Sequence, residues 1–165
     1  MELNLMPIMN FEGKQMTVDH TLDVETRKGD TFEILSPVKI TGTIVNIGGC
    51  LELEAEGNTT LSLTCDRCGN TFSQPFDFQI KERYKKEETD LGDNENPDII
   101  VLEGNTIDLC EIAYDNLVLS LPSKILCDSD CKGLCSQCGK NLNNGSCDCD
   151  TTPTDPRFDI LDKLL

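Results

Sequence analysis

Residues 127–149 read Cys127-Asp-Ser-Asp-Cys131-Lys-Gly-Leu-Cys135-Ser-Gln-Cys138-Gly-Lys-Asn-Leu-Asn-Asn-Gly-Ser-Cys147-Asp-Cys149 and hold six of the ten cysteines of the chain. Cysteines at this density either cross-link one another or bind a soft metal ion. Cys135, Cys138 and Gly139 have the form of a zinc knuckle, because two sulfurs at this spacing reach one ion and the glycine tolerates a positive φ. Cys147 and Cys149 follow after a loop of Asn, Gly and Ser. Together the four sulfurs would complete a closed tetrahedral site.

A second pair earlier in the chain has the same Cys-x2-Cys-Gly form, in Cys65-Asp-Arg-Cys68-Gly69. Eight candidate ligands predict one or two structural zinc ions. The preferred partition has one site of Cys135, Cys138, Cys147 and Cys149 and another of Cys65, Cys68, Cys127 and Cys131, which would join the C-terminal module to the rest of the protein. A pairing in which the two knuckles share one ion, a single zinc and no zinc stay open as alternatives.

Three further residues with metal-binding chemistry have simpler interpretations. Cys110 lies on an apolar helical stripe and is expected to be a small buried residue, and Cys50 receives the same interpretation. The single histidine, His20, shares its strand phase with Val18 and Leu22, so it is expected to pack at the edge of the core.

The charge balance restricts the partners. With 14 Lys and Arg against 30 Asp and Glu, the formal net charge is −16, and a zinc ion held by four thiolates lowers it further. A phosphate backbone would repel such a chain, whereas basic proteins would be attracted to it. The alternative is that the excess acid merely keeps the protein soluble.

Cysteine usage and the beginning of the sequence bear on the compartment. The first residues, Met1-Glu-Leu-Asn-Leu-Met-Pro, show no basic segment, no long apolar run and no small-residue cleavage site. No run of about 18 apolar residues occurs anywhere. We therefore expect a cytoplasmic protein whose thiols stay reduced, so that metal explains their clustering better than disulfides.

Alternating apolar and polar residues predict an α+β fold that is mainly β. Short runs at 16–24, 38–47, 50–56, 59–65 and 72–84 read as strands, with turns at Gly48-Gly49 and Gly57-Asn58. We expect an antiparallel meander of five or six strands, curled or barrel-like so that its edges are hidden. Zero Trp and 5% aromatic residues mean that its core is aliphatic.

The rest of the chain divides into a loop, two helices and the cysteine-rich module. Residues 85–97 read as an acidic loop, and residues 98–102 could re-enter the sheet. A helix with Asn105 or Thr106 as its cap is expected to end before Pro122, and a short C-terminal helix begins at Asp155-Pro156. The predicted domains are 1–104 (β-domain), 105–126 (packing helix and connector) and 127–165 (zinc module with the C-terminal helix).

Catalysis has little support in the sequence. A catalytic zinc keeps an open position, whereas these sites look closed by sulfur. There is no Gly-rich phosphate loop, no serine elbow and no histidine near the cysteines. A thiol redox or zinc-responsive role for Cys65 and Cys68 is the alternative, although the helix start that lowers a thiol pKa in thioredoxin-like pairs is missing.

The C-terminal half resembles the YceD family, the large ribosomal RNA subunit accumulation proteins. The matching words are Leu119-Ser-Leu-Pro122, Cys127-Asp-Ser-Asp-Cys131-Lys-Gly-Leu-Cys135-Ser-Gln-Cys138-Gly139, Asn141-Leu-Asn143, Cys147-Asp-Cys149 and Asp155-Pro-Arg-Phe158. The resemblance implies a non-enzymatic bacterial protein that supports the accumulation, processing or assembly of large-subunit (23S) ribosomal RNA.

Charge and resemblance together predict a zinc-stabilised ribosome-assembly adaptor that acts through a basic ribosomal protein or assembly factor. The competing version is direct RNA contact through a patch of four basic residues, Lys81, Arg83, Lys85 and Lys86. Four residues make a small patch, and a solvated strand end explains them as well.

Overall fold

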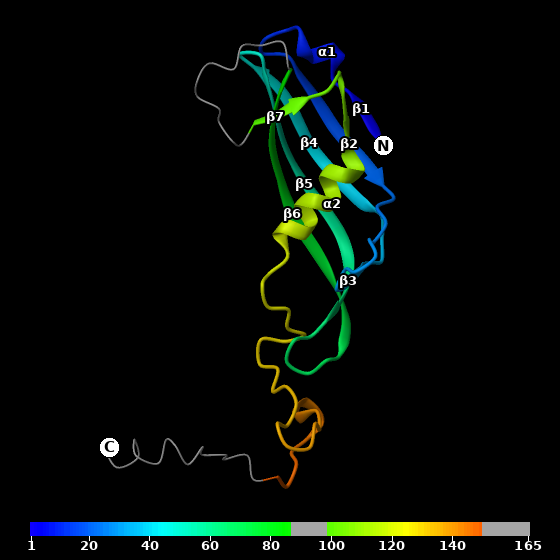
Figure 1. Ribbon diagram of the computed structural model, residues 1–165, viewed down its shortest axis with the longest axis vertical. Helices are drawn as coiled ribbons and strands as arrows, with labels where there is room; N and C mark the ends of the chain where they lie inside the picture. Colours follow the sequence, from blue (N-terminus) through cyan, green and yellow to red (C-terminus); the bar gives the residue numbers. More distant parts are fainter. Residues whose placement is uncertain (87–98, 150–165) are drawn as a thin grey trace, which may run out of the picture. The chain divides into compact units, whose positions relative to one another are not determined.

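The computed structural model describes residues 1–86 and 99–149 (Figure 1). The elements in chain order are β1 (Glu2–Asn4), α1 (Met6–Met9), β2 (Gln15–Leu22), β3 (Phe32–Ile34), β4 (Val38–Ile47), β5 (Cys50–Thr64), β6 (Thr71–Lys86), β7 (Ile99–Leu102), β8 (Thr106–Asp108), α2 (Leu109–Ser120) and the 3-10 turn η1 (Leu142–Asn144). The predicted α+β, mainly β fold is confirmed.

The chain forms two compact units. Unit 1 contains Met1–Leu63 and Ser73–Ser123, and unit 2 contains Thr64–Phe72 and the residues from Lys124 onward. The turn between β5 and β6 therefore belongs to the same unit as the cysteine-rich segment. The three predicted domain ranges stay a prediction.

Unit 1 is built on a six-stranded curled sheet with the order β2-β4-β5-β6-β7, in which β3 also pairs with β5. The β2–β4, β4–β5 and β3–β5 pairs are antiparallel, as expected of a meander. Residues 99–102 re-enter the sheet as predicted, but β7 pairs with β6 in parallel. The two-stranded antiparallel sheet of β1 and β8 was not predicted, because strands of three residues are too short to show alternation.

The core of unit 1 lies on one face of this sheet. Ile44 on β4 lies opposite Leu53 on β5, and both are almost fully buried. The next positions along β5, Glu52, Glu54 and Glu56, belong to the opposite face, as a period of two requires. Helix α2 lies across the sheet (Figure 1). The buried side chains of this core are mainly aliphatic, as predicted: Val18, Leu22, Val38, Ile40, Ile44, Leu51, Leu53, Leu61, Ile80, Leu109 and Leu117.

The turn predicted at Gly57-Asn58 is wrong. Strand β5 runs unbroken from Cys50 to Thr64, with Gly57 in its middle. A Cβ atom built on Gly57 would lie 2.2 Å from Cζ of Phe78, so the glycine makes room for a buried ring rather than for a turn. Glycine inside a strand commonly marks such a close approach.

The predicted cap of helix α2 is also wrong. Residues 106–108 are extended in β8, and the Asp108 side chain accepts hydrogen bonds from the backbone N–H groups of Cys110 and Glu111. The helix ends at Ser120, just before Pro122, as expected. Its buried residues are Leu109, Ile112, Ala113, Tyr114 and Leu117, and this set does not include Cys110.

Two predicted segments lie wholly or largely outside the described residues: the C-terminal helix from Asp155 and the acidic loop at 85–97, of which only Lys85 and Lys86 are described, at the end of β6. Within the described ranges, no helix is both long and apolar enough to cross a membrane.

We predict that Gly57→Ala lowers the free energy of unfolding of unit 1 by about 1–3 kcal/mol, because the added methyl group displaces the buried Phe78 ring. Urea denaturation followed by circular dichroism measures this loss. Phe78→Leu in the same chain should recover part of it, because the ring that meets the methyl group is gone. Equal losses from Gly57→Ala with and without Phe78→Leu would contradict the proposed contact.

Candidate metal centres

The turn between β5 and β6 forms the first cysteine knuckle. The Gly69 N–H donates to the Cys65 carbonyl at 2.9 Å, and the Cys65 N–H donates to the Asn70 carbonyl at 2.9 Å. Gly69 has a φ of +70°, which an L-residue adopts only with strain. The turn directs the backbone N–H groups of Arg67 and Cys68 to the Cys65 sulfur.

The second knuckle repeats these contacts one for one. The Gly139 N–H donates to the Cys135 carbonyl at 2.9 Å, the Cys135 N–H donates to the Lys140 carbonyl at 2.9 Å, and Gly139 also has a φ of +70°. The backbone N–H groups of Gln137 and Cys138 donate to the Cys135 sulfur. Two segments 70 positions apart in the chain thus adopt the same turn, because both carry Cys-x2-Cys-Gly.

The structure gathers eight sulfur atoms into two groups of four. Group A consists of Cys65, Cys68, Cys127 and Cys131, and group B consists of Cys135, Cys138, Cys147 and Cys149. Within each group all four sulfurs lie within 4.8 Å of one another. This membership is the partition that the sequence analysis preferred, and the pairing with both knuckles in one group does not occur among the described residues.

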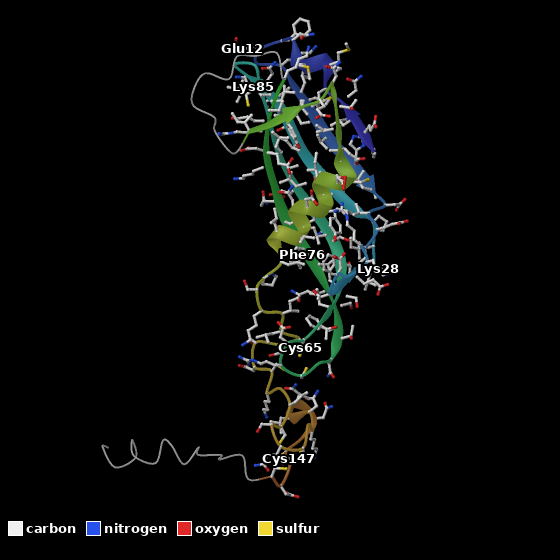
Figure 2. The ribbon with its side chains drawn as sticks, viewed as in Figure 1. Glu12, Lys28, Cys65, Phe76, Lys85 and Cys147 are labelled. Carbon is white, nitrogen blue, oxygen red and sulfur yellow. The ribbon has the colours of Figure 1, made fainter. Side chains whose placement is uncertain are left out.

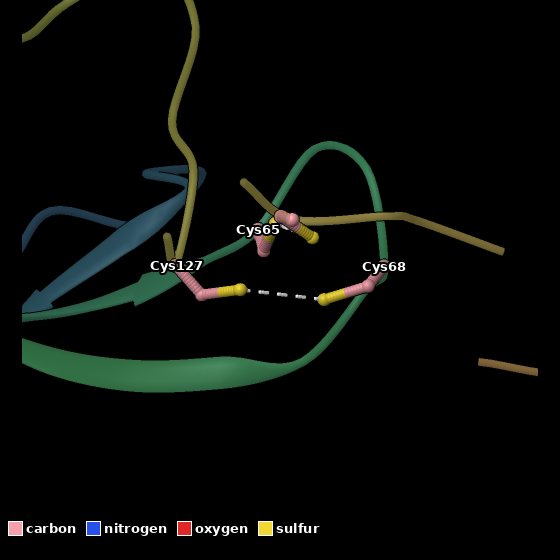
Figure 3. A group of neighbouring side chains, drawn as sticks. Cys65, Cys68 and Cys127 are labelled. Carbon is pink, nitrogen blue, oxygen red and sulfur yellow. Dashed lines mark hydrogen bonds between the residues drawn. The ribbon is translucent and has the colours of Figure 1, made fainter. Parts of the chain in front are cut away.

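Two sulfur–sulfur distances in group A match those of a tetrahedral zinc site. The sulfurs of Cys65 and Cys131 are 3.8 Å apart. Those of Cys68 and Cys127, which a dashed line joins in Figure 3, are 3.7 Å apart. Four sulfurs at about 2.3 Å from a tetrahedral ion lie about 3.8 Å from one another. A disulfide would bring two sulfurs to about 2.05 Å, and all ten cysteines are free.

The two groups differ in burial. In group A, Cys65, Cys68 and Cys131 are 1%, 4% and 3% exposed, and Phe72 and Leu126 pack against them, whereas Cys127 is exposed. In group B only Cys135 is buried, and Cys138 is exposed. Because more of its cysteines are buried, group A is less accessible to solvent and competing ligands than group B. Figure 2 labels one member of each group, Cys65 in A and Cys147 in B.

Each group contains thiols that ionise readily beside thiols that do not. The backbone N–H groups of Cys127, Cys68 and Arg67 lower the pKa of Cys65 to about 6, and those of Cys138 and Gln137 lower the pKa of Cys135 to about 6. Burial raises the pKa of Cys127 to about 12. Four adjacent thiolates repel one another unless a cation compensates their charge, so the donor set suits a soft divalent ion.

A family model with the description "Large ribosomal RNA subunit accumulation protein YceD" matches residues 53–165, which is more than half of the chain and includes both cysteine groups. The chain belongs to the YceD family. It is 28% identical over 167 residues to the Bacillus subtilis protein YlbN, with 99% of this chain and 93% of that protein covered.

Two plant members of the YceD family are also similar. The chloroplast YCED homolog 1 of Arabidopsis thaliana, named for large ribosomal RNA subunit accumulation, is 27% identical over 161 residues. The Zea mays protein of the same name is 27% identical over 143 residues. The alignments cover 78% and 69% of this chain but about half (49%) of each plant protein. No solved structure matches.

The sequence analysis missed the residues that tie the segments of this YceD protein together around the cysteines. Asp66 accepts a hydrogen bond from the Ile125 N–H at 2.6 Å, and the Asp66 N–H donates to the Ile125 carbonyl at 2.9 Å. Nη1 of Arg67 donates to the Cys131 carbonyl at 2.9 Å. Asn143 donates to the Cys131 sulfur at 3.2 Å. Only the location of Asp66 and Arg67 inside the first knuckle could have drawn attention to them.

The three residues set apart in the sequence analysis lie outside groups A and B. Cys50 and Cys110 are half-buried, not buried as expected. The Cys110 sulfur accepts a hydrogen bond from the terminal amine of Met1, 3.3 Å away, which explains its position beside rather than within the core. His20 is half-buried between Val18 and Leu22, as expected.

The four basic residues considered for RNA contact all lie on β6, but they do not form a purely positive surface. Nε of Arg83 is 3.0 Å from Oε1 of Glu52 on β5. Lys81 and Arg83 line a groove together with Glu52 and Glu54. Lys85 and Lys86 also have interaction partners. Carboxylates between the basic residues weaken attraction to phosphate.

A second groove of unit 1, with a volume of about 300 Å³, has an apolar floor and an acidic rim. Its floor includes four buried side chains, Tyr84, Leu102, Ile107 and Ile112. The rim carries Glu82, Asp108, Glu111 and Asp115, and none of the lining residues in the described part of the chain is basic. We call it the α2 groove, because three of its lining residues come from that helix.

We predict that Gly133→Ala disturbs the metal centres more than Gly139→Ala. Both glycines have a positive φ, +73° and +70°, so each substitution costs about 1–2 kcal/mol in backbone strain. A Cβ atom at Gly133 would also lie 3.0 Å from the Arg67 carbonyl oxygen, whereas one at Gly139 meets nothing within 4 Å.

The measurement is the rate at which zinc-loaded protein gives up metal to a chromophoric chelator. Gly133→Ala should release metal faster than Gly139→Ala, and both should release it faster than the unaltered chain. Slower release from Gly133→Ala than from Gly139→Ala would show that the close contact with the Arg67 carbonyl does not destabilise the metal centres.

Proposed function

We propose that this YceD protein is a non-enzymatic, zinc-stabilised adaptor that supports the accumulation of large-subunit ribosomal RNA by binding a basic ribosomal protein or assembly factor in the cytoplasm. The observation that carries the zinc part is the pair of four-sulfur groups, with sulfur separations of 3.7 and 3.8 Å in group A. The family description and the names of the plant relatives support the ribosomal part.

The residues of both groups fit zinc as a structural ion. Eight cysteines would supply two closed sets of sulfur ligands, and no histidine or carboxylate from residues 1–86 or 99–149 belongs to either group. A bound zinc ion would supply cross-links among residues 65–68 and 127–131 in group A and among residues 135–149 in group B. A closed set leaves no position for a substrate, which supports a role without catalysis.

Charge supports a protein partner over RNA. The net charge of −16 repels phosphate, and the basic residues of β6 lie beside Glu52 and Glu54. The α2 groove offers a basic segment an acidic rim and an apolar floor. Arg27 already pairs with Glu111 and Asp115, so an incoming arginine or lysine would compete with that contact.

The alternative function, a thiol redox or zinc-responsive protein that uses Cys65 and Cys68, has one observation in its favour, the lowered pKa of Cys65. Two observations weigh against it. Cys65 is 1% exposed, and the pair lies between two strands rather than at a helix start. Rapid, reversible oxidation of this pair with metal release would favour the alternative.

We predict that removal of metal by a chelator abolishes hydrogen-exchange protection in unit 2, over residues 64–72 and 124–149, and leaves protection in β2, β4 and β5 up to Leu63 unchanged. The physical reason is that a structural zinc contributes on the order of 10 kcal/mol of apparent folding free energy, while the apolar contacts around group A are few. Unchanged protection over 127–149 after complete zinc removal would contradict the structural role of the metal.

The partner is tested by affinity capture with the full-length chain as bait, in samples split into RNase-treated and untreated halves. A basic large-subunit protein or assembly factor should remain bound after RNase treatment. Ribosomal RNA that is captured alone and lost with RNase would show that the chain binds RNA directly and that the charge argument is wrong.

The α2 groove is tested by measuring how tightly variants of the chain bind the captured partner after its purification. Glu111→Gln with Asp115→Asn should weaken binding of the purified basic partner by about three- to tenfold at low salt, since two charges at the rim are lost. Asp19→Asn with Glu33→Gln is the matched control, because it removes the same charge from exposed strand positions outside the groove. Equal weakening by both pairs would mean that net charge, and not the groove, attracts the partner.

A further inference from the structure

One side chain reaches from the loop of group B to a sulfur of group A. Asn143 lies in η1, between the group B residues Cys138 and Cys147. Its Nδ2 donates to the sulfur of Cys131 at 3.2 Å, and its Oδ1 accepts from the Lys132 N–H at 2.7 Å. Both polar atoms of the carboxamide therefore hold the segment that begins at a group A cysteine.

Arg67 of the first knuckle forms hydrogen bonds with the same segment, residues 131–134. Arg67 donates through Nη1 to the Cys131 carbonyl at 2.9 Å, and its own carbonyl accepts from the Leu134 N–H at 3.2 Å. From the other direction, the Leu142 N–H donates to the Gly133 carbonyl at 2.9 Å. Residues 131–134 are thus shared between the two groups, and Cys135 of group B follows at once.

We infer that Asn143 is a positioning residue that couples the two metal sites, so that metal in group B raises the affinity of group A for its own ion. The inference rests on the proposal that both groups bind zinc. Metal in group B holds both ends of the loop 139–146, and the ordered loop places the Asn143 carboxamide against Cys131.

Local structure gives the loop little order of its own. Asn143, Asn144, Gly145 and Ser146 are exposed, and a turn of three residues does not persist without anchoring contacts. The anchors are the knuckle at Cys135–Cys138 and the pair Cys147 and Cys149, which an ion shared within group B would tie together in addition to the hydrogen bond that Nζ of Lys140 donates to the Ser146 carbonyl at 2.7 Å. Emptying group B therefore loosens the loop that presents the donor to Cys131.

The Asn143 contact matters for group A because hydrogen bonds from the second coordination sphere orient ligands and disperse their charge. Loss of such a partner typically lowers metal affinity by about 10–100-fold. Coupling between sites is reciprocal, so metal in group A strengthens group B by the same factor. Because group B is the more exposed of the two, it should lose its ion first, and group A should follow.

The experiment measures the zinc affinity of group A alone. Full-length zinc-loaded protein is exposed to graded chelator and then to an alkylating reagent, and mass spectrometry of the peptides reports the protection of Cys65, Cys68, Cys127 and Cys131 separately from that of group B. Group B is emptied by Cys147→Ser with Cys149→Ser. The affinity of group A is compared with and without this change.

Two substitutions of Asn143 separate its contacts. Asn143→Asp keeps an acceptor for the Lys132 N–H but loses the donor to sulfur, and Asn143→Ala loses both without adding charge. Asn144→Ala is the matched control, because it alters the neighbouring exposed asparagine of the same turn. Circular dichroism and hydrogen exchange over β2, β4 and β5 show that unit 1 is folded in each variant.

We expect emptying group B to lower the zinc affinity of group A by about tenfold or more. In Asn143→Asp and Asn143→Ala the affinity should already be lowered, and emptying group B should then have little further effect. Asn144→Ala should behave as the unaltered chain does.

Additive effects of emptying group B and of altering Asn143 would overturn the inference, because they would show that the residue does not carry the coupling. An unchanged affinity of group A in Asn143→Ala would overturn it as well. A different result separates the failure of the underlying proposal: if zinc protects neither group from alkylation in the unaltered chain, the protein does not bind zinc through these cysteines.

Discussion

The structure of unit 2 depends on the approach of four sulfur atoms from distant parts of the chain, residues 65–68 and 127–131, to a common centre. The contacts within group A join residues 59 and 66 positions apart, and closing loops of that length costs conformational entropy. The apolar residues packed on group A are few, chiefly Phe72 and Leu126. We propose that a soft cation bound by four thiolates offsets this cost, and that the hydrogen bonds of Asp66 and Arg67 then fix the arrangement.

The two units use different physical means to reach stability. Unit 1 buries aliphatic side chains on one face of a long-stranded sheet, and a capped helix lies across that sheet. Unit 2 has little secondary structure among its described residues beyond η1 and the strand ends, and its order comes from turns, sulfur contacts and side-chain to backbone hydrogen bonds. Acidic charge is compatible with both, because carboxylates on strand faces stay in solvent and a zinc ion in each group would compensate half of the charge of its four thiolates.

The features that sequence predicts well here are those with a short repeat or a fixed local spacing. The two Cys-x2-Cys-Gly motifs predicted the same turn correctly, because the positive φ of the glycine and the spacing of the sulfurs depend on about six consecutive residues only. Alternation located the strands that contain Ile44 and Leu53. The features that it missed depend on partners far along the chain. A side chain at position 57 would collide with the ring of Phe78. Residues 106–108 pair with β1, so helix α2 is capped by Asp108 and not by Asn105 or Thr106. Asn143 reads as a loop residue until its contact with Cys131 is seen.

The central claim, that two separate sets of four cysteines each hold one zinc ion, is tested most directly by native mass spectrometry of the full-length chain purified under reducing conditions. The account predicts two zinc ions per unaltered chain, at most one when Cys135 and Cys138 are replaced by serine, and two when Cys50 is replaced. A metal-free mass with paired disulfides, or one zinc ion per chain that survives replacement of either set, would contradict it.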